Sequence, residues 1–175
     1  MDNIYVIDDQ NYQDYTTHTV RIAVRGIIFI KDKLAMIKSQ EYGDYKFPGG
    51  GQELGEDHLD TLIREVKEET GLKVILESVE EFGFIQEKRK SIYDDKELFE
   101  AYSYYYFCEE DPKSKTCPSY SDEENELGYQ FVLVDINEAY RNNQELIKKI
   151  GKRASWIKRE TIVLEKLINM RKMHD

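Results

Sequence analysis

Three glutamates, Glu65, Glu68 and Glu69, are the residues whose type and spacing could do chemistry. On a helix, residues three and four positions apart lie on one face, so these carboxylates would converge. Carboxylates that close repel one another, whereas a hard divalent cation between them would reverse the sign of the interaction. Mg²⁺ and Mn²⁺ prefer oxygen ligands, and Mg²⁺ commonly shares phosphate oxygens of a substrate. The spacing by itself therefore suits a divalent metal site, although an acidic run on a helix is more often a solvated face.

The segment that carries these glutamates has the pattern of an amphipathic helix. Aliphatic residues recur at helical spacing along it, at Leu59, Leu62, Ile63 and Val66. Asp57 is suited to the N-cap, and Gly71 stands where a helix often ends in a left-handed residue. We therefore expect a helix that packs its aliphatic stripe on the core and presents the three carboxylates on another face.

A glycine-rich loop, Phe47-Pro48-Gly49-Gly50-Gly51, precedes this helix. Residues without a Cβ let a loop turn sharply and bring a backbone carbonyl close to a metal or a phosphate. Between loop and helix lie Glu56 and Arg64, which could form a bidentate pair that pins the loop to the helix. The sequence thus predicts one unit made of loop, pair and helix.

The alternative for the glutamates taken alone is a solvated acidic face, with Arg64 and Glu68 as an ordinary ion pair one turn apart. The complete spacing argues against that reading. From Gly50 to Leu72 the sequence follows G-x5-E-x7-R-E-U-x-E-E-x-G-U, where U is a bulky aliphatic residue. It resembles the signature of the Nudix hydrolases without departure at any fixed position. The resemblance implies cleavage of a diphosphate bond in a nucleoside diphosphate that carries a second group, with a divalent metal, Mg²⁺ or Mn²⁺.

The same resemblance implies roles for individual residues. The carbonyl of Gly49 would be a metal ligand beside Glu65, Glu68 and Glu69, while Gly50, Glu56, Arg64 and Gly71 would be structural. Family members often use a further glutamate from a downstream loop as a ligand or base. Glu124 is our choice here, with Glu123 and Glu126 as alternatives, and Glu65 and Glu68 are the candidates for the base within the motif.

Three residues outside the motif are candidates for substrate binding. Tyr45 and Phe47 precede the glycine-rich loop and could border the pocket. Arg25 could face either a terminal phosphate or a buried acid, and the sequence favours neither. The substrate is left open within nucleoside diphosphate derivatives, such as a nucleoside triphosphate or a nucleotide sugar.

Composition is that of a compact enzyme acting on a small substrate. The chain has 175 residues, of which 40% are hydrophobic, enough for one domain with a substantial core. Its formal net charge of -10 argues against general binding to nucleic acid polymers. Cys108 and Cys117 form no CxxC pair, and we expect free thiols in a reducing cytoplasm. We expect neither a signal peptide nor a membrane span, and a homodimer is left open.

The order of elements predicts an α/β fold. We expect strands at 4–7, 20–30, 33–37 and 98–108 and over 127–134, with a hairpin turn at Lys31-Asp32. Residues 73–85 read as one long or two broken strands with a bulge at Gly83, and 109–125 as a long loop. We expect short helices from Asp135 and over 143–150, the latter ending at Gly151.

This order suits a mixed sheet with helices on both faces, and the resemblance implies the same α/β/α sandwich. We expect a single domain over 1–175, with 1–15 as an N-terminal extension and 155–173 as a final helix.

Two other functions remain open at this level. A non-catalytic nucleotide sensor would not need the full set of glutamates. Processing of RNA 5′ ends, such as removal of a cap or a 5′-diphosphate, is disfavoured by the net charge and by the lack of an extended basic stripe.

Overall fold

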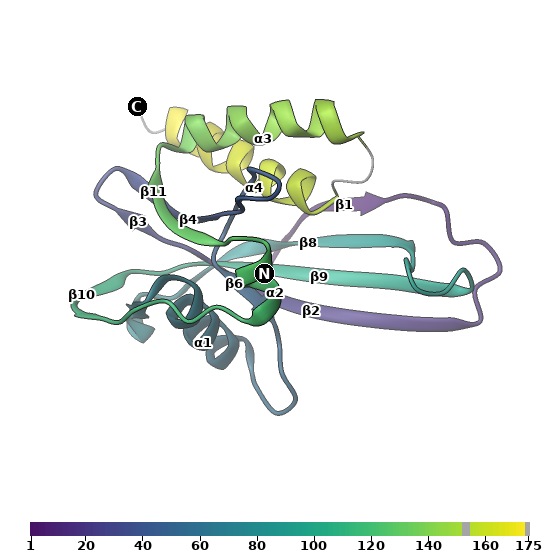
Figure 1. Cartoon of the computed structure of the whole chain (residues 1–175), viewed down its shortest axis with the longest axis horizontal. Helices are drawn as coiled ribbons and strands as arrows, with labels where there is room; N and C mark the ends of the chain where they lie inside the picture. The colour runs from purple at the N-terminus through teal and green to yellow at the C-terminus, as the bar shows by residue number, and fades with distance from the viewer. Residues whose placement is uncertain (152–154, 174–175) are drawn as a thin grey trace.

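The computed structural model describes residues 1–151 and 155–173. Its largest sheet has five strands in the order β1-β8-β9-β2-β6 (Figure 1). These strands are β1 (Asn3–Asp8), β8 (Glu80–Lys90), β9 (Glu97–Phe107), β2 (Thr17–Ile27) and β6 (Gly49–Gly51). The pairs β1·β8 and β2·β9 are parallel, whereas β8·β9 and β2·β6 are antiparallel, so the sheet is mixed as expected.

A second, smaller sheet has the order β11-β4-β3, with β5 also paired to β4. Its strands are β3 (Phe29–Ile30), β4 (Lys33–Lys38), β5 (Tyr45–Lys46) and β11 (Gln130–Val134). Ile30 pairs with Lys33 across the turn, and Lys31 has a φ of 59°, so the predicted hairpin is confirmed. A two-stranded ribbon joins β7 (Leu72–Val74) to β10 (Glu110–Lys115).

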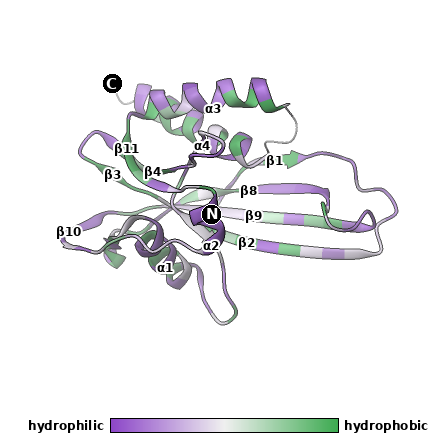
Figure 2. Cartoon of the chain, in the orientation of Figure 1, coloured by the Kyte–Doolittle hydropathy of each residue, from purple (hydrophilic) through white to green (hydrophobic). Residues whose placement is uncertain are grey.

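Helices cover both faces of the large sheet. Helix α1 (His58–Thr70) lies on one side, and α3 (Ile136–Ile150) and α4 (Ser155–Lys172) lie together on the other (Figure 1). One core cluster joins Leu62 and Val66 of α1 to the sheet, and a second joins the sheet to α3 and α4. In Figure 2 both hydrophilic and hydrophobic colours appear on α3, as expected for a helix that covers a core with one face. The α/β/α sandwich is thus present.

The ends of α1 are those that its sequence predicts. The Asp57 side chain accepts hydrogen bonds from the amides of Leu59 and Asp60, and Asp60 completes a capping box. Gly71 ends the helix in the left-handed region with a φ of 71°. A Cβ on Gly71 would lie 2.0 Å from the carbonyl oxygen of Thr116, so packing also requires glycine there. Both ends of α1 are therefore capped by local hydrogen bonds, and the C-terminal end is also fixed by packing on Thr116.

Several expected boundaries are wrong. The loop expected over 109–125 contains the strand β10 and the short helix α2 (Asp122–Glu126). Pro112 is tolerated in β10 because only the ends of that strand pair with β7. The two short helices expected after Asp135 form one continuous α3, which ends at Gly151 as predicted. Residues 73–85 break into β7, a 3-10 turn over Leu76–Ser78 and the start of β8, with the predicted register shift at Gly83.

The two ends of the described chain join the core. Strand β1 extends the sheet at the edge next to β8, and Ile7 is 5% exposed. Helix α4 buries Val163, Leu164 and Leu167 against the sheet and α3. None of the helices built by the described residues is sufficiently long and apolar to traverse a bilayer.

Candidate active site

The glycine-rich strand β6 lies directly against the acidic face of α1. Val24 of β2 pairs with Gly50, and a Cβ placed on Gly50 would lie 2.5 Å from the carboxylate of Glu65. Gly49 has a φ of 143°, and its Cβ would lie 2.1 Å from the carbonyl oxygen of Val24. Only glycine fits at either position, because a side chain on Gly49 would overlap β2 and a side chain on Gly50 would overlap the Glu65 carboxylate.

Arg64 fastens the loop to the helix. Its Nε and Nη2 donate to the two carboxylate oxygens of Glu56 at 2.6 and 2.9 Å, and Nη2 also donates to the carbonyl of Gly51 at 3.0 Å. The hydrogen bonds from Arg64 are the main cause that lowers the pKa of Glu56 to about 2. The pair has the bidentate geometry expected of a structural clamp.

The same guanidinium also reaches two of the motif's other glutamates. Nη1 of Arg64 donates to Glu65 at 2.7 Å and to Glu68 at 3.3 Å. The side chain of Glu65 is 13% exposed and that of Glu68 is 47% exposed. Burial raises the pKa of Glu65, against the lowering effect of Arg64. These two carboxylates therefore share one cation, at the border between the interior and solvent.

Glu69 is placed differently from the sequence expectation. It is 1% exposed, and its two oxygens accept hydrogen bonds from Lys46 at 2.6 Å and from the amide of Gly49 at 2.7 Å. Burial raises its pKa to about 7. Glu69 thus turns inward beneath the glycine-rich strand. Within 1–151 and 155–173, no three side chains of His, Cys, Asp or Glu gather into a group that could hold a metal ion.

The donor chemistry around Glu65 nevertheless suits a hard divalent cation. Glu65 and Glu68 offer carboxylate oxygens, and a positive charge near the part-buried Glu65 would stabilise its ionised form. The carbonyl of Gly49 accepts one hydrogen bond from Arg25 at 3.1 Å and retains a second lone pair. Glu69 is set apart from this group by its burial and by its hydrogen bonds from Lys46 and the Gly49 amide.

The downstream glutamates lie on α2. Glu124 caps this helix by accepting from the amide and hydroxyl of Ser121 at 2.8 and 3.0 Å. Burial would raise the pKa of Glu124. The hydrogen bond from the Ser121 amide, the Glu69 side chain and the charge of Lys46 outweigh that effect and lower the pKa. Glu124 also contributes to the raised pKa of Glu65 through repulsion. The fold therefore brings α2 into the electrostatic range of α1.

The expected substrate-binding residues lie below the surface. Tyr45 is 5% exposed and Phe47 is 0% exposed, and the Phe47 ring packs edge-on against Tyr105. Arg25 is 7% exposed, donates to the carbonyls of Phe47 and Gly49, and lies 3.5 Å from Glu160. The sequence left open whether Arg25 faces a terminal phosphate or a buried acid, and in the structure it faces the buried Glu160. Arg25 therefore holds the glycine-rich loop through the carbonyls of Phe47 and Gly49.

Sequence reasoning missed two residues that hold this loop. Lys46 pairs with Glu69, and its position between Tyr45 and Phe47 on a strand could have indicated that it faces the opposite way. Glu160 accepts from the amide of Phe47 at 3.0 Å, and no local spacing could have pointed to a residue on α4.

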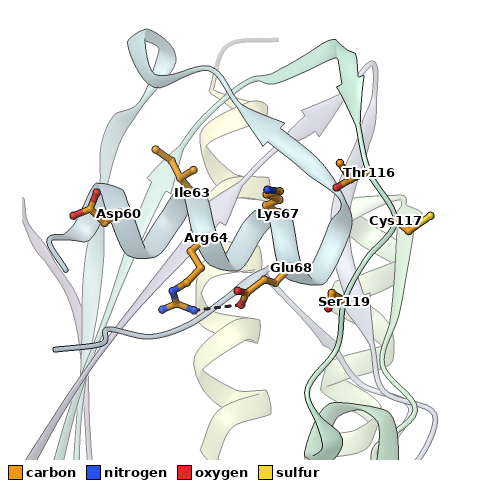
Figure 3. Close-up of a pocket in the computed structure, with 8 residues that line it drawn as sticks. All are labelled: Asp60, Ile63, Arg64, Lys67, Glu68, Thr116, Cys117 and Ser119. Atoms are coloured by element: carbon orange, nitrogen blue, oxygen red, sulfur yellow. Dashed lines mark hydrogen bonds and ion pairs between the residues drawn. The ribbon is translucent and has the colours of Figure 1, made fainter. Parts of the chain in front are cut away.

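A pocket of about 490 Å³ lies on the outer side of α1 (Figure 3). It is lined by Asp60, Ile63, Arg64, Lys67, Glu68, Thr116, Cys117 and Ser119. The segment opposite α1 is held in place by the amides of Thr116 and Ser119, which donate to the carbonyls of Gly71 and Glu68. This pocket meets the acidic face of α1 only through Arg64 and Glu68.

The chain is 43% identical over 63 residues to the mouse (Mus musculus) protein "Nucleoside diphosphate-linked moiety X motif 6", a stretch that is 34% of this chain and 20% of that relative. This chain therefore spans about a fifth of the length of that curated relative.

Solved structures with a similar arrangement include a NUDIX hydrolase from Nitrosomonas europaea, with a TM-score of 0.48 and 18% identity over 72% of this chain and 79% of that one. An ADP-ribose pyrophosphatase from Streptococcus suis has a TM-score of 0.44 and 19% identity over 68% of this chain and 76% of that one.

The family model described as the NUDIX domain matches residues 19–154. The matched region holds the glycine-rich strand, the Glu56–Arg64 clamp, all three glutamates of α1 and the helix α2. Because this match covers well over half of the 175 residues, the chain belongs to the NUDIX domain family.

Proposed function

We propose that this protein is a divalent-metal-dependent hydrolase that cleaves the diphosphate bond of a nucleoside diphosphate linked to another moiety. The observation that carries the proposal is the contact between Glu65 and Gly50, held in register by Arg64. It brings an ionisable oxygen of α1 to a strand whose backbone a phosphate can approach. Membership of the NUDIX domain family supports the same activity.

Glu65, Glu68 and the carbonyl of Gly49 are the groups we propose to hold Mg²⁺ or Mn²⁺, with Glu69 as a further ligand if it exchanges Lys46. When bound, the ion would neutralise phosphate charge and lower the pKa of a bound water. Arg64 keeps the two carboxylates from repelling each other in the metal-free protein. The residues of the clamp, Glu56 and Arg64, act on the scaffold and touch no reacting atom.

Proton transfer is the second requirement of the reaction. A water that attacks phosphorus must lose a proton to a carboxylate oxygen. We assign that role to Glu124, because α2 places it within the electrostatic range of Glu65 and its pKa is lowered, so it is ionised at neutral pH. Glu65 is the alternative base, since burial already raises its pKa.

The proposed substrate is small. The net charge of -10 disfavours a polyanionic polymer, and the local charge that a phosphate needs would come from the metal and from basic side chains at the site. Cys108 and Cys117 are free thiols, which fits our proposal of a cytoplasmic protein.

The test is a panel of nucleoside diphosphate derivatives, incubated with the protein and Mg²⁺, with products identified by mass. The panel includes triphosphates, nucleotide sugars, dinucleotides and a 5′-triphosphorylated RNA oligomer. We expect cleavage within the diphosphate of at least one small substrate, and loss of turnover by at least about 100-fold in Glu68→Gln. Glu77→Gln, an exposed glutamate on the 3-10 turn, is the matched control and should keep full turnover.

Three results would contradict the proposal. Binding without turnover across the panel would indicate a sensor. Cleavage of the RNA oligomer alone would move the substrate to RNA 5′ ends. Normal turnover by Glu68→Gln would remove the acidic face of α1 from the reaction.

A further inference from the structure

Arg21, Ala23 and Arg25 lie on the same side of β2, because alternate residues of a strand face the same way. Ala23 pairs with Gly51, the last residue of β6. A Cβ placed on Gly51 would lie 3.6 Å from Nη2 and 3.7 Å from Nε of Arg21. The guanidinium of Arg21 therefore lies beside the backbone at the end of the glycine-rich strand.

The charges around Arg21 are unbalanced. After desolvation by burial, the positive charges of Arg25 and Arg159, which repel Arg21, lower its pKa most. Glu65 and Glu123 attract Arg21, but their effect on the pKa is smaller. Among residues 1–151 and 155–173, Arg25 and Arg159 both have carboxylate partners, but no hydrogen bond or ion pair is formed by the Arg21 guanidinium. A chain with a net charge of -10 thus keeps one arginine without a carboxylate beside its acidic helix.

Arg21 is exposed to solvent, although neighbouring protein atoms surround part of its guanidinium. This partial desolvation is the largest cause that lowers the pKa of Arg21. Its fork of donors is therefore available, in a place where an anion would be attracted more strongly than on an open surface.

We propose that Arg21 binds phosphate oxygens of the substrate's diphosphate, as a substrate-binding residue at the end of the glycine-rich strand. The inference rests on the proposed function. A planar guanidinium matches two phosphate oxygens with two parallel hydrogen bonds, whereas a lysine acts as a point charge. Because consecutive residues of a strand face opposite ways, Glu65 lies on one face of β6 at Gly50. Arg21 lies on the other face at Gly51. Since β6 is an edge strand of its sheet, a diphosphate that crosses this edge would meet oxygen ligands for its metal on one face and a cation for its remaining charge on the other.

Binding of imidodiphosphate, a diphosphate analogue with a P–N–P bridge that resists hydrolysis, tests this inference directly. Calorimetric titrations would be made with Mg²⁺ present, using wild type, Arg21→Met and Arg21→Lys. We expect Arg21→Met to weaken binding by roughly 10- to 100-fold, because a charge-assisted bidentate contact is lost. Arg21→Lys should lie between the two. Affinity for Mn²⁺ alone should be the same in all three proteins.

Arg89→Met is the matched control. Arg89 lies on β8, its guanidinium stacks over the Phe99 ring at 4.3 Å, and it donates to the carbonyl of Lys90 at 3.1 Å. The Arg89→Met substitution removes one positive charge, as Arg21→Met does, but at a distance from β6. Binding of imidodiphosphate should therefore stay within about twofold of wild type. Thermal unfolding of each variant checks that the fold is intact.

The outcomes separate this inference from the function on which it rests. Unchanged imidodiphosphate binding in Arg21→Met, in a protein whose wild type binds Mn²⁺ and turns over a nucleotide, would overturn the role of Arg21 alone. Equal weakening by Arg89→Met would reduce the effect to net charge and also overturn it. A wild type that binds no Mn²⁺ and hydrolyses nothing in the panel would overturn the proposed function itself.

Discussion

The backbone amide of Phe47 donates a hydrogen bond of 3.0 Å to the carboxylate of Glu160, 113 residues later in the chain. Glu160 belongs to α4, which lies beyond the region 19–154 that matches the NUDIX domain. It is 0% exposed and also contacts Arg25 and Arg159. The glycine-rich loop is therefore held from below by a helix outside the family match.

Replacing Glu160 with glutamine should destabilise the protein by about 3 kcal/mol, because it leaves the buried Arg25 without a carboxylate and removes one of the two carboxylates that contact Arg159. Chemical denaturation would measure the free energy of unfolding. The control is Glu165→Gln, an exposed residue of the same helix whose contact with the Tyr140 hydroxyl an amide can replace. Equal stability of both variants would mean that α4 does not support the loop through this charge.

Gly50→Ala should lower the free energy of unfolding by about 1–3 kcal/mol, because the new Cβ would overlap the Glu65 carboxylate. Gly51→Ala is the comparison, since its Cβ meets nothing closer than 3.6 Å and its φ lies outside the left-handed region. Thermal unfolding of both variants without metal would check this difference. If Gly51→Ala proved the less stable variant, the packing of β6 on α1 would be wrong.

Acid should weaken the clamp between Glu56 and Arg64. The pKa of Glu56 in the folded protein is about 2, below its ordinary value of 4.5, so its stabilising contribution is present above pH 4.5 and lost as the pH falls towards 2. Stability measured against pH should decline less steeply in Glu56→Gln over that range. Glu53→Gln, an exposed neighbour, should decline like wild type. A wild-type slope in Glu56→Gln would contradict the assignment.

Glu124→Gln should lower kcat by roughly 100-fold or more with only a small change in KM, because proton removal from water matters as the reaction proceeds and not in binding. Ser121→Ala is the necessary comparison, since Glu124 also caps α2 through Ser121. Steady-state kinetics from pH 6 to 9 would separate the two effects. A similar loss in both variants would indicate capping, and unchanged kcat in Glu124→Gln would move the base to Glu65.

Glu123→Gln and Glu126→Gln complete that series on the same short helix. Both should keep kcat close to wild type if Glu124 is the base. A large loss in either one instead would reassign the role within α2, and the KM of Glu123→Gln would show whether its proximity to Arg21 affects substrate binding.

Local chemistry allowed the sequence alone to determine the helix α1. Asp57 and Gly71 cap α1 through hydrogen bonds with neighbouring residues in the chain, and Glu56 and Arg64 are only eight residues apart. The hairpin turn at Lys31 is likewise set by backbone preferences within a few residues. Such features need no knowledge of distant segments, and the expected α/β/α sandwich follows from their order.

Tertiary structure decided which charged groups meet. Glu69 belongs by spacing with Glu65 and Glu68, but Lys46 and the Gly49 amide draw it into the interior. Arg25 had two alternatives until Glu160 was placed beneath it, and Arg21, four residues earlier, was left without a carboxylate. The strand β10 was missed because pairing with the distant β7 creates it. The helix α2 was missed for another reason, since its start is a local capping box of Ser121 and Glu124 that the sequence contains but that was not recognised in it. Apart from α2, each of these outcomes depends on residues far apart in the chain, whose electrostatic and packing energies no local pattern contains.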